Sequence, residues 1–233
     1  ILGKTHTVEF ALGATGLNKP KGTPQNPWDS NTHRIPGGSS SGSAVAVASG
    51  LAAFAIGTDT GGSVRIPAAL TGIAGLKTTK GVWPTDGIFP LSPTLDTPGP
   101  LARCFEDIKY IYDSYQGITK KSKTLSLEGL KLAKLGSPFI DELDKEVSIA
   151  FENFCEQLRQ KGVHIEDLDI PEAKERTELF PPIVGSEIIS AFGVERFLKE
   201  VEKMDPVTAK RAKMGLDVKA TNYLKLQNRL TEL

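Results

Sequence analysis

The stretch Gly57-Thr58-Asp59-Thr60-Gly61-Gly62-Ser63-Val64-Arg65-Ile66-Pro67 decides the fold around it. It follows an apolar run, residues 51–56, and ends at a proline, which is favoured in a first helical turn because it has no N–H to lose there. We expect a strand, a glycine bend and then a helix, with Ser63 at the junction. The backbone N–H groups of Thr60, Gly61, Gly62 and Ser63 are expected to be unpaired. Such a bend is an anion site, or an oxyanion hole around a nucleophilic hydroxyl.

A second cluster of small residues, Gly37-Gly38-Ser39-Ser40-Ser41-Gly42-Ser43, lies upstream. Taken alone, the cluster at residues 57–63 is most simply a turn, and the cluster at residues 37–43 has the composition of a flexible linker. The apolar segment between them argues against a linker, because two clusters that bracket a buried segment can face each other across one site. We predict a helix over 42–50, with Gly50 as its stop, and a strand over 53–57.

Composition narrows the functional classes. The 233 residues include 28 basic and 28 acidic side chains, so net charge gives no case for binding nucleic acid or anionic lipid. No apolar run is long enough for a bilayer and no signal peptide is recognisable. Cys104 and Cys155 are expected to be free thiols in a reducing compartment, which predicts a cytoplasmic protein. The three histidines lack metal-ligand spacing, so no metal site is expected.

The remainder of the chain predicts helices and short strands. A short helix is expected over 5–12, and residues 81–100 are expected to form a loop with Asp86, Ser92 and Asp96 as polar candidates. Further helices are predicted over 105–115, 144–161, 187–204 and 206–233. The strands predicted over 129–136 and 163–168 flank the second of these helices, as in a parallel α/β unit.

These elements predict an α/β fold with a mixed, largely parallel central sheet covered by helices on both faces. We expect residues 1–103 to form the core with both serine clusters and residues 104–233 to form the helix-rich remainder of the same domain, with no independent boundary between them. The chain opens in what reads as a strand and closes in what reads as a helix. We therefore expect a fold that is incomplete at both ends.

The two clusters together, GGSSSGSAVAVASG and GTDTGGSVRIPAALTGIAGLKTT, resemble the amidase signature family, and SPTLDTPGPLAR from residue 92 fits the same pattern. That family transfers acyl groups from carboxamides with a Ser–cis-Ser–Lys triad. The resemblance implies that Ser63 is the nucleophile and that Ser39, after a cis peptide bond from Gly38, is the bridging serine.

The resemblance also assigns supporting roles. It implies an oxyanion hole built from the backbone amides of Thr60, Gly61, Gly62 and Ser63. Asp59 and Arg65 match supports of this bend, and Ser40 matches a residue that hydrogen-bonds the triad lysine. The family's lysine belongs to a segment upstream of ILGKT, outside residues 1–233, and the lysines at positions 4, 77 and 80 do not match it.

The implied activity is hydrolysis of a small carboxamide with release of ammonia or an amine, with no cofactor and no membrane partner. A homodimer is left open. Two alternatives share the chemistry: the glutaminase subunit of a tRNA-dependent amidotransferase, which would bring in nucleic acid, and an allophanate- or biuret-type hydrolase. A different class is a non-catalytic or phosphate-binding α/β module, although neither cluster has the G-x-G-x-x-G spacing of a nucleotide site.

Overall fold

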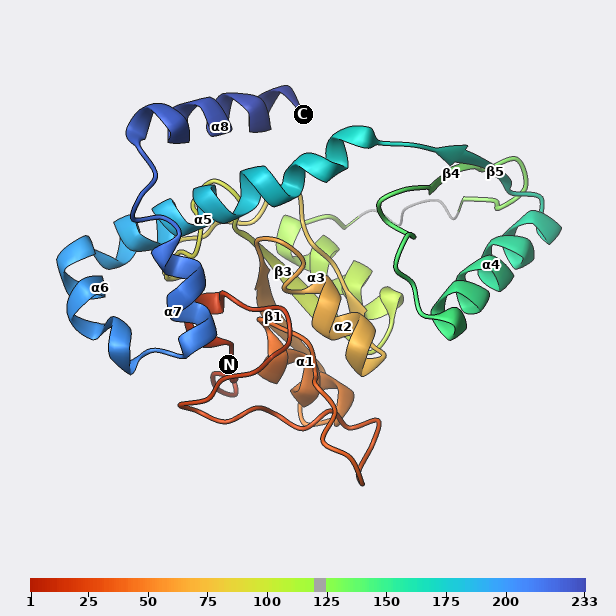
Figure 1. The fold of residues 1–233 in the computed structure, drawn as a ribbon. Coiled ribbons are helices and arrows are strands. Elements are labelled where there is room, and N and C mark those ends of the chain that lie inside the picture. The colour runs from red at the N-terminus through yellow and green to blue at the C-terminus, as the bar shows by residue number, and fades with distance from the viewer. Residues whose placement is uncertain (120–124) are drawn as a thin grey trace. The chain divides into compact units, whose positions relative to one another are not determined.

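The computed structural model describes residues 1–119 and 125–233 (Figure 1). They divide into two compact units, one made of Ile1–Thr119 and Phe180–Thr231 and the other of Lys120–Leu179 and Glu232–Leu233. Both serine clusters lie in the first unit. None of the helices in the described part of the chain combines the length and the apolar character that crossing a membrane requires.

A three-stranded antiparallel sheet forms the centre of the first unit. Its strand order is β1 (Phe54–Asp59), β3 (Thr97–Ala102), β2 (Ala74–Gly75). In the register of β1 and β3, Asp59 lies opposite Thr97 and Phe54 lies opposite Ala102. The expectation of a large, mainly parallel central sheet is therefore wrong for the described residues, because β3 runs back between β1 and β2 and pairs antiparallel with both.

Strand β3 lies partly in the stretch predicted to be a loop. Its prolines, Pro98 and Pro100, argue against a central strand because proline cannot donate a hydrogen bond to a neighbouring strand. The structure accommodates them because β2 is short and pairs only with Leu101 and Ala102. Neither proline therefore has to donate a ladder bond to β2.

Helices cover both faces of this sheet (Figure 1). Successive residues of a strand point to opposite faces, so Leu101 and Ala102 of β3 serve different layers. Leu101 is buried against α1 (Ser41–Ala48) and α2 (Arg65–Thr71), whereas Ala102 packs with Ile108 of α3 (Phe105–Gln116). The helices predicted over 42–50 and 105–115 are confirmed.

The first unit also contains a helical layer made of α5 (Arg176–Phe192), α6 (Val194–Glu200), the 3₁₀ turn η3 (Val201–Lys203), α7 (Pro206–Lys213) and α8 (Ala220–Glu232). The first four residues of α5 and the last residue of α8 belong to the second unit. Val184 and Ile188 of α5 share one buried cluster with Phe197 of α6. The helix predicted over 187–204 differs in extent, since α5 begins at Arg176 and Gly193 separates it from α6. The helix predicted over 206–233 is two helices in the structure.

The helix expected over residues 5–12 is wrong. Only the 3₁₀ turn η1 (Glu9–Ala11) forms there. Phe10 and Ala11 have φ angles of 54° and 58°, and an α-helix cannot continue through residues in this left-handed region. The segment instead runs beside the glycine- and serine-rich cluster at residues 37–43, where the Val8 N–H donates to the Ser39 carbonyl at 3.1 Å.

The second unit contains the predicted strand–helix–strand arrangement. Strands β4 (Lys131–Leu135) and β5 (His164–Leu168) pair in parallel around α4 (Lys145–Gln160). Apolar residues recur at helical spacing along α4, and Cys155 on that face is buried. The unit also contains the 3₁₀ turn η2 (Pro171–Glu175). The parallel pairing predicted from the sequence is confirmed here.

Candidate active site

The two glycine- and serine-rich clusters meet in the structure. The cluster at residues 37–43, the first bend, runs into α1, which begins at Ser41, and the cluster at residues 57–63, the second bend, connects β1 to α2. The Ser40 N–H donates to the Ser63 carbonyl at 3.2 Å, which joins the two bends directly. The Ser40 hydroxyl adds a second link, since it lies 3.2 Å from the Thr58 N–H and 3.3 Å from the Thr58 carbonyl. Ser40 therefore ties the first bend to the end of β1.

Ser39 is one of the fully buried serines of the first bend. The Gly38–Ser39 peptide bond is cis, as the resemblance implies. The Ser39 carbonyl accepts hydrogen bonds from the Thr7 hydroxyl at 2.9 Å and from the Val8 N–H at 3.1 Å. The side chain is fully buried, yet its Oγ has no hydrogen-bond partner within residues 1–119 and 125–233. A buried hydroxyl without a partner is uncommon and calls for an explanation.

Ser63 lies at the end of the second bend and is 9% exposed, which places it at the edge of the buried region. Its carbonyl is held by Ser40, and α2 begins two residues later. A hydrogen bond between the hydroxyls of Ser39 and Ser63 is not formed in the described residues, because Ser39 Oγ is unpartnered. The backbone contact through Ser40 nevertheless places both serines in one site.

The Asp59 side chain binds the backbone of the second bend. Its carboxylate is fully buried and accepts hydrogen bonds from the N–H groups of Gly62 at 2.7 Å and Val64 at 3.1 Å. The Arg65 guanidinium adds two contacts at 3.0 Å, and the Thr97 hydroxyl donates to the Asp59 carbonyl at 2.8 Å. The N–H groups of the bend and the Arg65 guanidinium therefore converge on one carboxylate, that of Asp59.

The pKa of Asp59 reflects this enclosure. Burial raises the pKa of a carboxyl group, because the charged form loses water. The hydrogen bonds from Arg65, Val64 and Gly62 and the positive charge of Arg65 outweigh burial, so the Asp59 pKa lies below its ordinary value. Asp59 is thus an anion that holds backbone donors in place.

The backbone amides of the bend divide into two groups. The Gly62 N–H is not free, contrary to expectation, because it donates to Asp59. In the described part of the chain, the N–H groups of Thr60, Gly61 and Ser63 have no acceptor. The Phe180 ring of α5 lies against Gly61, where an added Cβ would come within 2.8 Å of two ring atoms. No motif in the sequence indicated Phe180.

A network of buried polar groups lies beside the bend, and the sequence signalled only part of it. Asp96, a polar candidate, accepts a hydrogen bond from the Thr60 hydroxyl at 2.5 Å. Ser92, another candidate, donates its hydroxyl to Glu187 of α5, which sequence reasoning missed. Tyr223 of α8 donates to the same carboxylate at 2.6 Å. Asp86, the third candidate, takes no part in this network.

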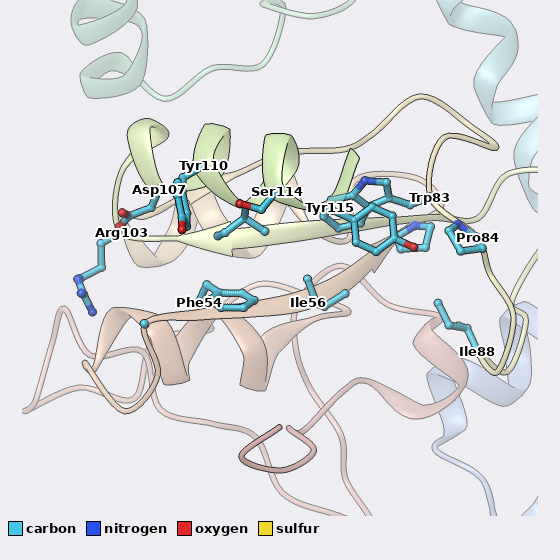
Figure 2. Close-up of a pocket in the computed structure, with 13 residues that line it drawn as sticks. Phe54, Ile56, Trp83, Pro84, Ile88, Arg103, Asp107, Tyr110, Ser114 and Tyr115 are labelled. Atoms are coloured by element: carbon cyan, nitrogen blue, oxygen red, sulfur yellow. The ribbon is translucent and has the colours of Figure 1, made fainter. Parts of the chain in front are cut away.

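A separate apolar pocket of about 800 Å³ lies between β1 and α3. In Figure 2, Phe54 and Ile56 of β1 face Tyr110 and Tyr115 of α3, with Trp83 at one end. None of the predicted site residues lines this pocket. The apolar pocket is therefore distinct from the site formed by the two serines.

Comparison with known proteins shows the family of the chain. The chain belongs to the amidase family: the family model described as Amidase matches residues 1–231. Over nearly its whole length the chain also superposes on a solved structure titled "Crystal structure of amidase", with a TM-score of 0.90 and 29% identity, covering 99% of this chain and 52% of the other. The α/β architecture is thus that of amidases.

The curated relatives carry several names. The 2-amino-5-chloromuconic acid deaminase of Comamonas testosteroni is 40% identical over 231 residues, covering 97% of this chain and 50% of the relative. The indoleacetamide hydrolase of Rhizobium radiobacter is 42% identical over 74% of this chain and 36% of the relative. A glutamyl-tRNA(Gln) amidotransferase subunit of Symbiobacterium thermophilum is 38% identical over 73% of this chain and 38% of its own length. The chain spans half the length of these relatives or less.

Proposed function

We propose that the protein hydrolyses the C–N bond of a small carboxamide through a seryl acyl-enzyme, with Ser63 as the nucleophile and Ser39 as the proton relay. One observation carries the proposal: the buried Ser39 hydroxyl has no partner among the described residues, and it lies in a bend joined to that of Ser63 through the Ser40 N–H. A hydroxyl can both donate and accept a proton, which suits a relay.

In the proposed reaction, the Ser63 oxygen attacks the amide carbonyl carbon while its proton passes to Ser39, which passes its own proton to a base. The free N–H groups of Gly61 and Ser63 are proposed to stabilise the oxyanion. Return of the proton through Ser39 to the leaving nitrogen breaks the C–N bond and leaves an ester on Ser63. Water then cleaves the ester and frees the carboxylic acid.

The base is proposed to be a lysine outside residues 1–233. Lys77 donates to the Thr78 carbonyl and Lys80 to the Thr94 carbonyl, so both are occupied away from Ser39. A lysine acting as a base near pH 7 must be neutral, so its pKa has to fall by about three units, equivalent to about 4 kcal/mol. Desolvation beside the buried Ser39 is the physical source of such a shift.

The substrate is proposed to be a small amide with an unsaturated or aromatic acyl group. The support is indirect: relatives are named for a chloromuconic acid and for indoleacetamide, and the Phe180 ring lies beside Gly61 of the bend. An aromatic side chain at this place offers a flat apolar surface to a planar group.

A panel of free carboxamides tests the proposal. The native protein is expected to release ammonia from small aryl amides without any added partner protein, and Ser63→Ala is expected to release none. Release of ammonia by Ser63→Ala at the native rate would overturn the nucleophile assignment.

The rival function, a glutaminase subunit, is supported by the amidotransferase relative. It predicts glutamine as the preferred amide and activity that depends on added partner subunits. Hydrolysis confined to glutamine, and only in the presence of those subunits, would favour this alternative over the free-standing amidase.

A further inference from the structure

We propose that Asp96 is a positioning residue for acyl transfer and that it acts through the hydroxyl of Thr60. The inference rests on the proposed function, because Asp96 has this task only if the bend of residues 60–63 holds an oxyanion. The observation behind it is a single contact: the Thr60 Oγ1 donates to Asp96 Oδ1 at 2.5 Å, a short distance typical of a hydroxyl bound to a carboxylate.

The bend is held by carboxylates at both ends. Asp59 binds the N–H groups of Gly62 and Val64, which fixes the end nearest α2. Asp96 binds the side chain of Thr60, which fixes the end nearest β1. The unpaired N–H groups of Gly61 and Ser63 lie between these two anchors. Their direction is therefore set by two carboxylates and not by the glycine-rich backbone alone.

Asp96 is itself held firmly. Its second oxygen, Oδ2, accepts the N–H groups of Leu91 and Ser92, each at 2.9 Å, and the residue is 7% exposed. Among the described residues, the carboxylate accepts hydrogen bonds from Thr60 and from its own loop, so it orients the bend and does not contact the reacting atoms. An anchor of this kind acts by limiting the movement of the donors.

The loop of Asp96 is in turn attached to the helical layer. Glu187 of α5 accepts the Ser92 hydroxyl and, at 3.1 Å, the Thr94 N–H. Tyr223 of α8 donates to Glu187 at 2.6 Å, and Gln227 donates to it at 3.0 Å. A continuous set of contacts thus runs from α8 through Glu187 and the loop to Thr60.

The pKa values of Asp96 and Glu187 are shifted in opposite directions. Burial and the negative charge of Glu187 raise the pKa of Asp96. Burial also acts on Glu187, but hydrogen bonds from Ser92, Thr94 and Tyr223 outweigh it and lower the Glu187 pKa. The three donors that bind the Asp96 carboxylate, the Thr60 hydroxyl and the N–H groups of Leu91 and Ser92, are all uncharged. The Thr60 hydroxyl is therefore an important donor for Asp96, and its removal affects both partners of the contact.

The test compares Thr60→Val, which removes the hydroxyl at nearly constant volume, with Thr60→Ser, which retains it, in the native full-length protein. Thr60→Val is expected to lower kcat by about 10-fold to 100-fold, the scale of a misplaced catalytic group. KM is expected to stay constant, because the lost stabilisation belongs to the transition state. Thr60→Ser is expected to recover most of kcat.

Thr71→Val is the matched control. The Thr71 hydroxyl is also buried, with 1% of the residue exposed, and donates to the Pro67 carbonyl at 2.7 Å within α2. Its loss is expected to lower the unfolding temperature without lowering kcat. A Thr60→Val enzyme with the kcat of Thr71→Val would overturn the inference, and so would a Thr60→Ser enzyme no better than Thr60→Val.

A double-mutant cycle with Asp96→Asn tests whether Asp96 acts through Thr60. The effects on kcat are expected to be non-additive, with Asp96→Asn/Thr60→Val no slower than the slower single variant. If the fold-losses in kcat of the two single variants multiply in the double variant, the claim that Asp96 acts through Thr60 is overturned. If Asp96→Asn does not fold, the kcat values of Thr60→Val and Thr60→Ser alone test the inference. Ser63→Ala, measured alongside, separates the claims: activity lost there but intact in Thr60→Val overturns the Asp96 inference alone, whereas activity intact in Ser63→Ala overturns the proposed function and this inference with it.

Discussion

Replacing Asp59 with asparagine is the perturbation whose effect the structure defines best. The carboxylate is fully buried and accepts five hydrogen bonds, from the N–H groups of Gly62, Val64 and Arg65 and from two nitrogens of the Arg65 guanidinium. Asparagine keeps one acceptor oxygen and places an NH₂ group where the other stood. At least one donor then faces another donor.

The magnitude follows from these contacts. A buried N–H left without an acceptor costs about 1–3 kcal/mol. The loss of charge opposite Arg65 adds about 1 kcal/mol or less, because the Arg65 side chain is 55% exposed and water screens it. We therefore expect Asp59→Asn to lower the free energy of unfolding by about 1–4 kcal/mol.

Urea unfolding of the native protein and of two variants measures this loss. Asp29 offers a matched control, since it accepts the N–H groups of Asn31 and Thr32 and pairs with Arg34 at 2.8 Å, but on an exposed loop. Asp29→Asn is expected to change stability far less. Equal losses for Asp29→Asn and Asp59→Asn would refute the argument that burial makes the Asp59 contacts strong.

The same variant has a pH signature. The folded pKa of Asp59 is lowered, so its contribution to stability is fully present above the unfolded pKa of about 3.9 and is lost as pH falls through the folded pKa. The stability difference between the native protein and Asp59→Asn is therefore expected to shrink in acid. A difference that stays constant down to the acid limit would contradict the lowered pKa.

Three further predictions concern neighbouring groups. Gly57→Ala places a Cβ 2.5 Å from the Ser40 hydroxyl and is expected to lower the free energy of unfolding in urea by about 1–3 kcal/mol. Gly3→Ala is the control and is expected to be neutral, because nothing lies within 4 Å of its Cβ. Equal stabilities of the two variants would contradict the close contact at Gly57. Glu187→Gln is expected to lower the unfolding temperature and to weaken the dependence of stability on pH in acid. The reason is that a carboxyl group with a lowered pKa stabilises the fold above its ordinary pKa and loses this contribution in acid. An unchanged pH dependence in acid would contradict this. Ser39→Ala is expected to slow acylation by about 10²–10⁴-fold with similar substrate affinity, and an unchanged single-turnover rate would exclude Ser39 from the relay.

The sequence predicted the local structure around the site well, because that structure depends on local chemistry. The glycine bend before Ile66-Pro67 has few conformations open to it, so the strand, the bend and α2 followed from residue type alone. The family motif likewise implied the cis bond before Ser39. The hydrogen bond from the Gly62 N–H to Asp59 could not be predicted in this way, since it depends on where the Asp59 carboxylate points.

The errors arose where distant contacts decide the structure. β3 contains two prolines and became a strand because β1 supplies its partner along the whole length. The left-handed backbone at Phe10 is compatible with its packing against Phe192, whose ring centre lies 5.0 Å away, and no local pattern of residues indicated that contact. Glu187 and Phe180 reach the bend from far along the chain, on a helix with no motif.

The account depends most on the claim that Ser63 forms a covalent acyl intermediate. Incubating the native full-length protein with a fluorophosphonate, followed by peptide mass spectrometry, tests this claim directly. We predict a single adduct on Ser63 and none in Ser63→Ala, with slower labelling in Ser39→Ala. An adduct on another serine, or equal labelling of Ser63→Ala, would contradict the account.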